Sequence, residues 1–234
     1  MRGAQARWWL GLLVAVLGTM DGSGGMASPM GELRLAGGRT VRLAGIELAD
    51  AGGPALAELA RGALALDPAA PPLDRWGRLR AQVRVEGGVW LQAELVRRGL
   101  AVVAPADDVP EAAVRELLAL ERQARAERAG IWADGVHGPW PATKVAAEPW
   151  RYVLVEGRVA KVARAAGFVY LNFGRRWKED FTLRAEEATA KRLAKAGLDL
   201  MALEGRNVLA RGVLFENDGP MIEIAHPDQV EVRE

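Results

Sequence analysis

The stretch V41-R-L-A-G-I-E-L-A-D50 decides how this sequence is interpreted. Arg42 alternates with apolar neighbours, which is the pattern of a strand with one buried face. A short Ala-Gly turn follows, and after it come two carboxylates, Glu47 and Asp50. A guanidinium on a strand beside two acids indicates an acid–base site, a metal site, or the remains of one.

The composition removes most other chemistries. The chain of 234 residues has no Cys, two His and a formal net charge of +1. Thiol nucleophiles, thiolate metal sites and disulfides are therefore excluded. His137 and His226 each lie beside Gly or Pro, so we expect solvated loop side chains and no zinc site. The serines, Ser23 and Ser28, lie near the N-terminus, which leaves Asp, Glu, Arg and a hard cation to carry any reaction.

The N-terminal segment has the pattern of an export signal. M1-R-G-A-Q-A-R7 carries two arginines and is followed by the apolar run from Trp8 to Gly18. That run is short for a membrane span, and small residues before Ser28 predict cleavage after Ala27. We therefore expect a signal peptide over 1–27, a periplasmic or secreted protein, and no transmembrane span after cleavage. An uncleaved membrane anchor is the alternative.

Two folded regions are expected after this segment, over 28–134 and 150–234, with a Gly- and Pro-rich linker at 135–149. In the first region the pattern predicts a hairpin turning at Gly37-Gly38. A helix is expected over 53–66. A second helix is predicted from Pro110 to Ala129, capped by Asp108, with Val114, Leu117 and Leu118 buried.

The second region has five short strand patterns with one helical segment between the third and fourth. This is the order of elements in an OB-fold barrel. The predicted fold class is therefore mainly β with α (α+β). The strands are expected at 152–163, 167–174, 180–184, 205–215 and 220–232, and the helix at 186–196.

Three segments of the first region together resemble the staphylococcal nuclease (thermonuclease) family. They are V41–D50, D74-R-W-G-R-L-R-A-Q-V83, and L95-V-R-R-G-L-A101 followed by A126-E-R-A-G-I-W132. The resemblance implies an OB-fold barrel braced by helices, whose active members hydrolyse DNA and RNA with one Ca²⁺. It also implies that Arg42 and Arg78 are the family's phosphate-binding arginines. A guanidinium fork matches two charged oxygens of a phosphate at once.

The acidic positions depart from the family pattern. The family's first calcium-binding Asp falls at Gly31, its second is replaced by Glu47, and its proposed general base Glu is replaced by Asp50. Ca²⁺ requires several oxygen ligands, and a base offset by ~1 Å loses on the order of a hundredfold in rate. The resemblance therefore implies no tightly bound cofactor, weak calcium binding at most, no closed metal cage, and hydrolysis that is weak or lost.

The second region predicts an outward face with aromatic and basic residues. Strand alternation separates an apolar face from one that carries rings, and residues 151–178 hold seven Lys or Arg against one acid. Rings within a basic surface favour single-stranded nucleic acid, although the same rings could pack against the linker. The candidate binding residues are Tyr152, Arg158, Phe168, Tyr170, Arg175, Arg176 and Lys178.

Three functions remain open from the sequence. The first is an exported nuclease homologue that binds nucleic acid, or another phosphate-rich or acidic polymer, with phosphodiesterase activity weak or lost. The second is an active calcium-dependent nuclease that has rebuilt its metal site from Glu32, Glu47 and Asp50. The third is an envelope module whose arginines serve protein contacts.

Overall fold

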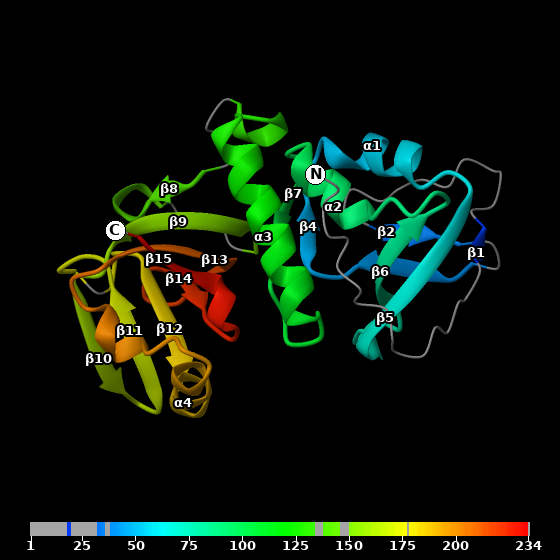
Figure 1. The fold of residues 1–234 in the computed structure, drawn as a ribbon. Helices are drawn as coiled ribbons and strands as arrows, with labels where there is room; N and C mark the ends of the chain where they lie inside the picture. Colours follow the sequence, from blue (N-terminus) through cyan, green and yellow to red (C-terminus); the bar gives the residue numbers. More distant parts are fainter. Residues whose placement is uncertain are drawn as a thin grey trace, which may run out of the picture.

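The computed structural model describes residues 18–19, 32–35, 38–133, 138–145, 150–176 and 178–233. The chain forms two barrels, and helix α3 stands between them (Figure 1). The predicted export signal, Gly31 and His137 lie outside the described residues, except that β1 (Gly18–Thr19) pairs with strand β5. No helix in the described part of the chain is long and apolar enough to cross a membrane.

The first barrel combines a mixed sheet, in the order β1-β5-β6-β3-β2, with a second pair of strands, β4 and β7. Strands β3 and β6 pair in parallel, and the other neighbours in this barrel are antiparallel. The elements are β2 (Glu32–Arg34), β3 (Thr40–Leu43), β4 (Ile46–Leu48), α1 (Gly52–Leu59), β5 (Ala63–Leu73), β6 (Leu79–Val85), α2 (Leu91–Arg97), β7 (Ala101–Val103), α3 (Glu111–Ala126) and the 3-10 turn η1 (Gly130–Trp132).

Two buried glutamines fix the turn between β3 and β4. Gln82 on β6 donates from Nε2 to the carbonyl oxygen of Ala44, at 2.9 Å, and Gln92 on α2 donates to Ala81 O at 2.9 Å. The Trp90 indole donates in turn to the Gln82 side-chain oxygen at 2.9 Å. A buried amide that satisfies buried backbone carbonyls has one preferred orientation. The turn that separates Arg42 from Glu47 is therefore held rigidly against the core.

Two predictions in this barrel were wrong. The helix expected over 53–66 ends at Leu59, and Ala63 begins strand β5 instead. Gly62 stops the helix at φ 91°, and the alternating side chains that follow pair with β6, Leu64 opposite Val85. Asp108 does not cap α3, because Pro110 occupies the N-cap position and the Asp108 carboxylate pairs with Arg80.

The predicted burial along α3 is confirmed. Val114 and Leu117 are fully buried and Leu118 nearly so, at the helical spacing that places them on one face. Glu121 lies on the same helix and is also fully buried, which the sequence did not predict. Its partner comes from the second barrel.

The second barrel has the strand order β10-β11-β12-β14-β13-β9-β8, with β15 also paired to β13. Each of the five predicted strand segments contains a strand, and the predicted helix is present as α4, but the segments 152–163 and 220–232 are each divided into two strands. The elements are β8 (Trp140–Pro141), η2 (Ala142–Lys144), β9 (Tyr152–Arg158), β10 (Lys161–Ala165), β11 (Phe168–Asn172), β12 (Thr182–Glu186), α4 (Glu187–Lys195), η3 (Leu200–Leu203), β13 (Asn207–Glu216), β14 (Pro220–Glu223), η4 (Pro227–Gln229) and β15 (Val230–Arg233).

This order is the one expected of an OB-fold barrel. Strands β9 and β10 act as one bent strand, since β9 pairs with β13 and β10 pairs with β11. Strands β12 and β14 pair in parallel, with α4 directly after β12. The predicted apolar face is buried as expected, and the predicted α+β class is confirmed. That face consists of Val153, Val155, Val159, Val169, Leu171 and Phe173.

A buried ion pair joins the two barrels. Arg211 on β13 donates from Nη1 to Glu121 Oε2 at 2.9 Å, and both side chains are at most 1% exposed. The same carboxylate oxygen accepts from Val103 N at 2.7 Å, and Tyr152 donates its hydroxyl to Val103 O at 3.2 Å. An apolar cluster of Ala124, Ile131, Trp132, Leu154 and Leu209 surrounds this junction.

We predict that Glu121→Gln destabilises the chain strongly. The amide cannot neutralise Arg211, and an uncompensated buried charge costs about 3–5 kcal/mol. Urea unfolding should show this loss in the free energy of unfolding. Glu111→Gln, which breaks an exposed pair with Arg115 on the same helix, should leave stability nearly unchanged. Equal effects of the two substitutions would contradict the role given to this pair.

Candidate functional site: an arginine-lined cleft

Strand pairing gathers three arginines on one face of the first barrel. Arg42 on β3 lies between Glu32 on β2 and Arg80 on β6, because these three residues are direct cross-strand partners. Cross-strand partners point to the same side of a sheet, and residues two apart along a strand do likewise. Arg78, two positions before Arg80, therefore joins this row, while Leu79 between them is buried.

Each of the three arginines has a carboxylate partner. Arg42 Nη2 lies 2.5 Å from Glu47 Oε1, and Arg78 Nε lies 2.6 Å from Asp74 Oδ2. Arg78 also pairs with Glu32. The third arginine, Arg80, pairs with Asp108. Arg78 nevertheless keeps one buried nitrogen, Nη2, for which no hydrogen-bond partner is found among the described residues. A buried donor of this kind favours an added oxygen, because leaving it unsatisfied costs about 1–3 kcal/mol.

Glu47 is the carboxylate that pairs with Arg42, and it also lies within the electrostatic range of Arg80 and Arg78. Burial raises the pKa of the Glu47 carboxyl above its ordinary value, and the charges of Arg42, Arg80 and Arg78 oppose that shift without cancelling it. Arg42 and Arg78 thus lie within the electrostatic range of one group, and their sharing of one phosphate site stays a prediction. The structure also adds Arg80, which the sequence analysis did not single out.

A cleft of about 450 Å³ is lined by Arg42, Glu47 and Arg80, whereas Arg78 is not among its lining residues. Its rim carries Trp76, whose ring is 60% exposed at the end of the β5–β6 hairpin. The guanidinium carbons of Arg75 and Arg78 lie 3.9 and 4.6 Å from the centre of this ring. The D74-R-W-G-R78 motif contains Trp76, but the family resemblance assigned a role only to Arg78 of this motif. The exposed part of this ring offers a stacking surface beside the charged floor.

Asp50 is exposed and lies next to this cleft rather than in it. It lines a smaller cavity, of about 230 Å³, whose other wall comes from the linker and β9. Glu47 lines both cavities and so belongs to the wall between them. The sequence predicted that Glu47 and Asp50 lie beside one site. In the structure Glu47 lines the cleft, and Asp50 lines the neighbouring cavity.

The acids of the cleft do not fit a calcium site in the described part of the chain. The Glu47 carboxylate is engaged by Arg42 and the Glu32 carboxylate by Arg78. Among the described residues there is also no group of three or more His, Asp or Glu side chains that could hold a metal. Ca²⁺ prefers six to eight oxygen ligands. We therefore derive no metal-dependent step from these residues.

The outward face of the second barrel carries two of the predicted rings. Phe168 and Tyr170 are half-buried neighbours on β11, with ring centres 6.0 Å apart. Arg184 on β12, which the sequence analysis missed, lies over Phe168 at 4.9 Å and over Phe215 at 4.8 Å. Tyr170 and Arg175 line a groove of about 830 Å³ together with Lys161, Asn172, Asn217 and Asp218.

Tyr152 has a different place from the one predicted. Its hydroxyl donates to Val103 O at the junction of the barrels, and burial raises the pKa of this hydroxyl. The ring is therefore committed to the domain contact and does not belong to the outward face. The reason is that the first residue of β9 meets the first barrel, whereas Phe168 and Tyr170 on β11 do not.

The predicted basic residues around this face are dispersed. Arg158 is exposed and donates to Gly205 O at 3.0 Å, and Arg176 pairs with Glu179 at 2.7 Å. Lys178 is exposed in the β11–β12 connection. Of the predicted cations, only Arg175 lines the groove beside Tyr170.

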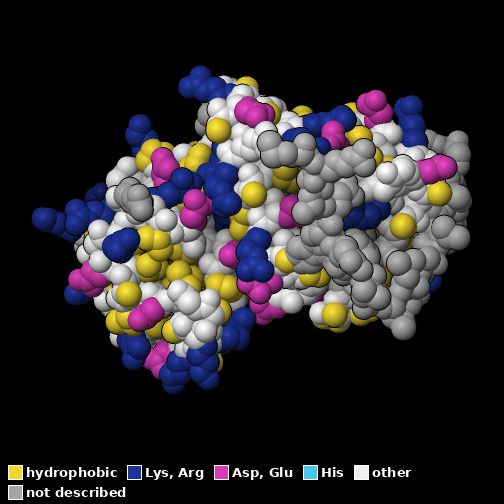
Figure 2. Space-filling model, viewed as in Figure 1, with side chains coloured by type: hydrophobic (Ala, Val, Ile, Leu, Met, Phe, Trp, Pro, Cys, Tyr) yellow, Lys and Arg dark blue, Asp and Glu magenta, His cyan; other side chains and the backbone are white. Residues whose placement is uncertain are grey.

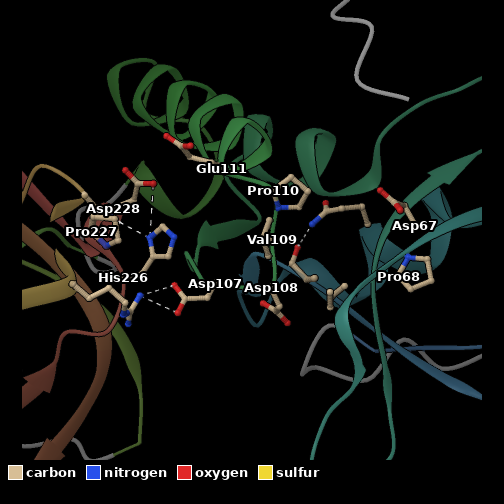
Figure 3. A pocket seen from close by; sticks show the side chains of 16 residues that line it. Asp67, Pro68, Asp107, Asp108, Val109, Pro110, Glu111, His226, Pro227 and Asp228 are labelled. Carbon is tan, nitrogen blue, oxygen red and sulfur yellow. Dashed lines mark hydrogen bonds and ion pairs between the residues drawn. The ribbon is translucent and has the colours of Figure 1, made fainter. Parts of the chain in front are cut away.

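A fourth hollow, of about 730 Å³, lies between the barrels and is acidic (Figure 3). Its walls include Asp67, whose carboxyl pKa is raised by burial, and Asp107, which pairs with Arg192 at 3.1 Å. His226 also lines it and is buried, so the prediction of a solvated histidine was wrong. Its Nδ1 accepts from Asp228 N at 3.2 Å and caps η4. Excess carboxylates make this hollow unsuitable for phosphate.

The barrel and its cleft define a helix-braced OB-type domain with an arginine-lined surface site. Residues 58–134 match the family model described as staphylococcal nuclease homologue. No curated protein matches the chain. The first domain is thus a nuclease-family domain, as the motifs predicted. The match includes Arg78 and Trp76 but not Arg42, Glu47 or Asp50, whose relation to it rests on the β3–β6 and β4–β7 pairing.

We predict that Glu47→Gln strengthens phosphate binding in the cleft. The amide removes the negative charge that occupies Arg42, and an ion pair of about 1 kcal/mol corresponds to about fivefold in affinity. Protonation has the same effect as the substitution. Wild-type affinity for a short oligonucleotide should therefore rise as pH falls through the raised pKa of Glu47, and the variant should not share this rise.

Glu86→Gln, at an exposed acid after β6, serves as the matched control and should leave the pH profile unchanged. A fluorescence-anisotropy titration over a pH series measures both variants. Weaker binding by Glu47→Gln would instead indicate that the carboxylate serves a ligand or a metal.

Proposed function

We propose that this chain is a nuclease-family protein that binds single-stranded nucleic acid, or a polymer with similar phosphates, with phosphodiester hydrolysis weak or lost. The proposal includes export to the periplasm or the medium, on the strength of the N-terminal pattern. No tightly bound cofactor is part of it.

The observation that carries the proposal is the row of Arg42, Arg78 and Arg80 on neighbouring strands, in which Arg42 pairs with Glu47 at the cleft. A phosphate in the cleft can replace Glu47 as the partner of Arg42, with the charge of Arg80 beside it. Trp76 at the rim supplies a stacking surface for an adjoining base. Phosphate groups and bases alternate along a single strand of nucleic acid. The cleft offers arginines for the phosphates and the Trp76 ring for a base.

Whole-molecule charge gives little support to nucleic-acid binding, so the attraction must be local. The net charge is +1, and Figure 2 shows cationic and anionic side chains interspersed over the visible face. The groove of the second barrel, with Tyr170 and Arg175, is a second surface of suitable chemistry. The strands and loops at this place in an OB fold are those that receive oligonucleotides.

The partner of Glu47 and the position of Asp50 support a loss of hydrolysis. Glu47 is bound by Arg42, and Asp50 lines the neighbouring cavity, away from Arg78 and Arg80. A general base must reach the attacking water beside the phosphate that the arginines hold. These residues therefore favour binding of a phosphodiester over its cleavage.

We predict that Arg42→Gln weakens oligonucleotide binding about tenfold, on the scale of a hydrogen bond to a charged group. The substitution should also reduce the dependence of log affinity on log salt by about one contact. Anisotropy titration of a labelled single strand with the full chain, at several salt concentrations, measures both quantities.

Arg122→Gln, at an exposed arginine on α3 outside the cleft, is the matched control and should bind like wild type. Binding that is absent in wild type, or equally affected by both substitutions, would remove the support for this proposal. An envelope module with protein partners would then be favoured.

A further inference from the structure

The small cavity between β4 and the linker is lined by Trp150, a tryptophan with high exposure and a left-handed backbone. Trp150 is 81% exposed, the highest value among the large exposed hydrophobic side chains. Its φ is 72°, in the left-handed region, where a residue with a Cβ is strained. Trp150 N donates to Leu214 O at 2.6 Å, which anchors this backbone to β13. Strain retained at an exposed aromatic points to a role for the ring.

The other walls of the cavity carry complementary groups. Trp140 on β8 lies under the guanidinium of Arg151 at 5.3 Å, and both line the cavity with Trp150. On the opposite wall, β4 and the residues after it contribute the carboxylates of Glu47 and Asp50. The cavity, of about 230 Å³, therefore presents aromatic surface on one side and hydrogen-bond acceptors on the other.

The cavity also lies next to the arginine-lined cleft. Glu47 lines both hollows, so a ligand that is held by Arg42 and Arg80 and reaches past Glu47 would place its next group at the cavity. Two carboxylates would repel a second phosphate. A base can stack on tryptophan, and its amino group can donate to Asp50, as cytosine N4 does to acidic side chains.

We propose that this cavity is a nucleobase subsite, in which Trp150 stacks on a base and Asp50 accepts a hydrogen bond from its exocyclic amino group. The inference rests on the proposed function and deepens it, since it names the part of the ligand next to the phosphate. The linker and the second barrel thus complete a site whose charged floor belongs to the first domain. Bases with an amino group are favoured over thymine.

The test compares oligodeoxycytidylate with oligodeoxythymidylate of equal length, using the full chain. Trp150→Gly suits the left-handed backbone, so it removes the ring while relieving strain. It should weaken binding of both oligonucleotides about tenfold, the scale of one stacked base. Trp150→Phe should retain most of the affinity. Asp50→Ala should weaken binding of the cytidine strand only, and so abolish the preference between the two.

Met201→Ala, at an exposed apolar residue of η3, is the control and should change neither affinity. If wild type binds oligonucleotides in an Arg42-dependent way but Trp150→Gly binds equally well, the subsite is overturned while the proposed function stands. If wild type binds neither strand, the proposed function itself fails. Binding of tetramethylammonium that Trp150→Gly abolishes, without any effect of this substitution on oligonucleotides, would assign the cavity to a cationic ligand and contradict the proposal.

Discussion

The relation between the two barrels depends on the buried pair of Glu121 and Arg211. Neither charge has water to solvate it, so each depends on the other as its nearest charged partner, with Arg125 farther away at 3.8 Å from Glu121 Oε1. Val103 joins the pair through both its N–H and its carbonyl, which links β7 to α3, β9 and β13. Because β7 pairs with β4, the contact between the barrels is one strand away from Glu47.

This arrangement explains how a linker residue can belong to a site of the first domain. Strand β9 is fixed to the first barrel through Tyr152, and the residues just before it are therefore held beside β4. Trp140 and Trp150 line the same cavity as Asp50. Arg42 and Arg80 line the neighbouring cleft, which shares Glu47 with that cavity. The proposed binding surface, from Trp76 through Arg42 to Trp150, depends on this junction.

The sequence predicted features that depend on local pattern and missed those that depend on distant partners. Strand alternation correctly predicted the buried face of the second barrel, whereas the common phosphate site of Arg42 and Arg78, implied by the family resemblance, stays a prediction. Glu121, Tyr152 and His226 were missed or misplaced because their environment is supplied by residues far along the chain. Helix propensity at 63–66 was overridden by pairing with β6, a long-range contact that composition does not reveal.

The central claim is that the cleft holds a phosphodiester and does not cut it. The most direct test is the length of a labelled single strand recovered after incubation with excess full chain, in Ca²⁺ and in a chelator. The account predicts strand that is bound yet full length under both conditions. Calcium-dependent shortening that Asp50→Ala abolishes would contradict it and identify the chain as an active nuclease.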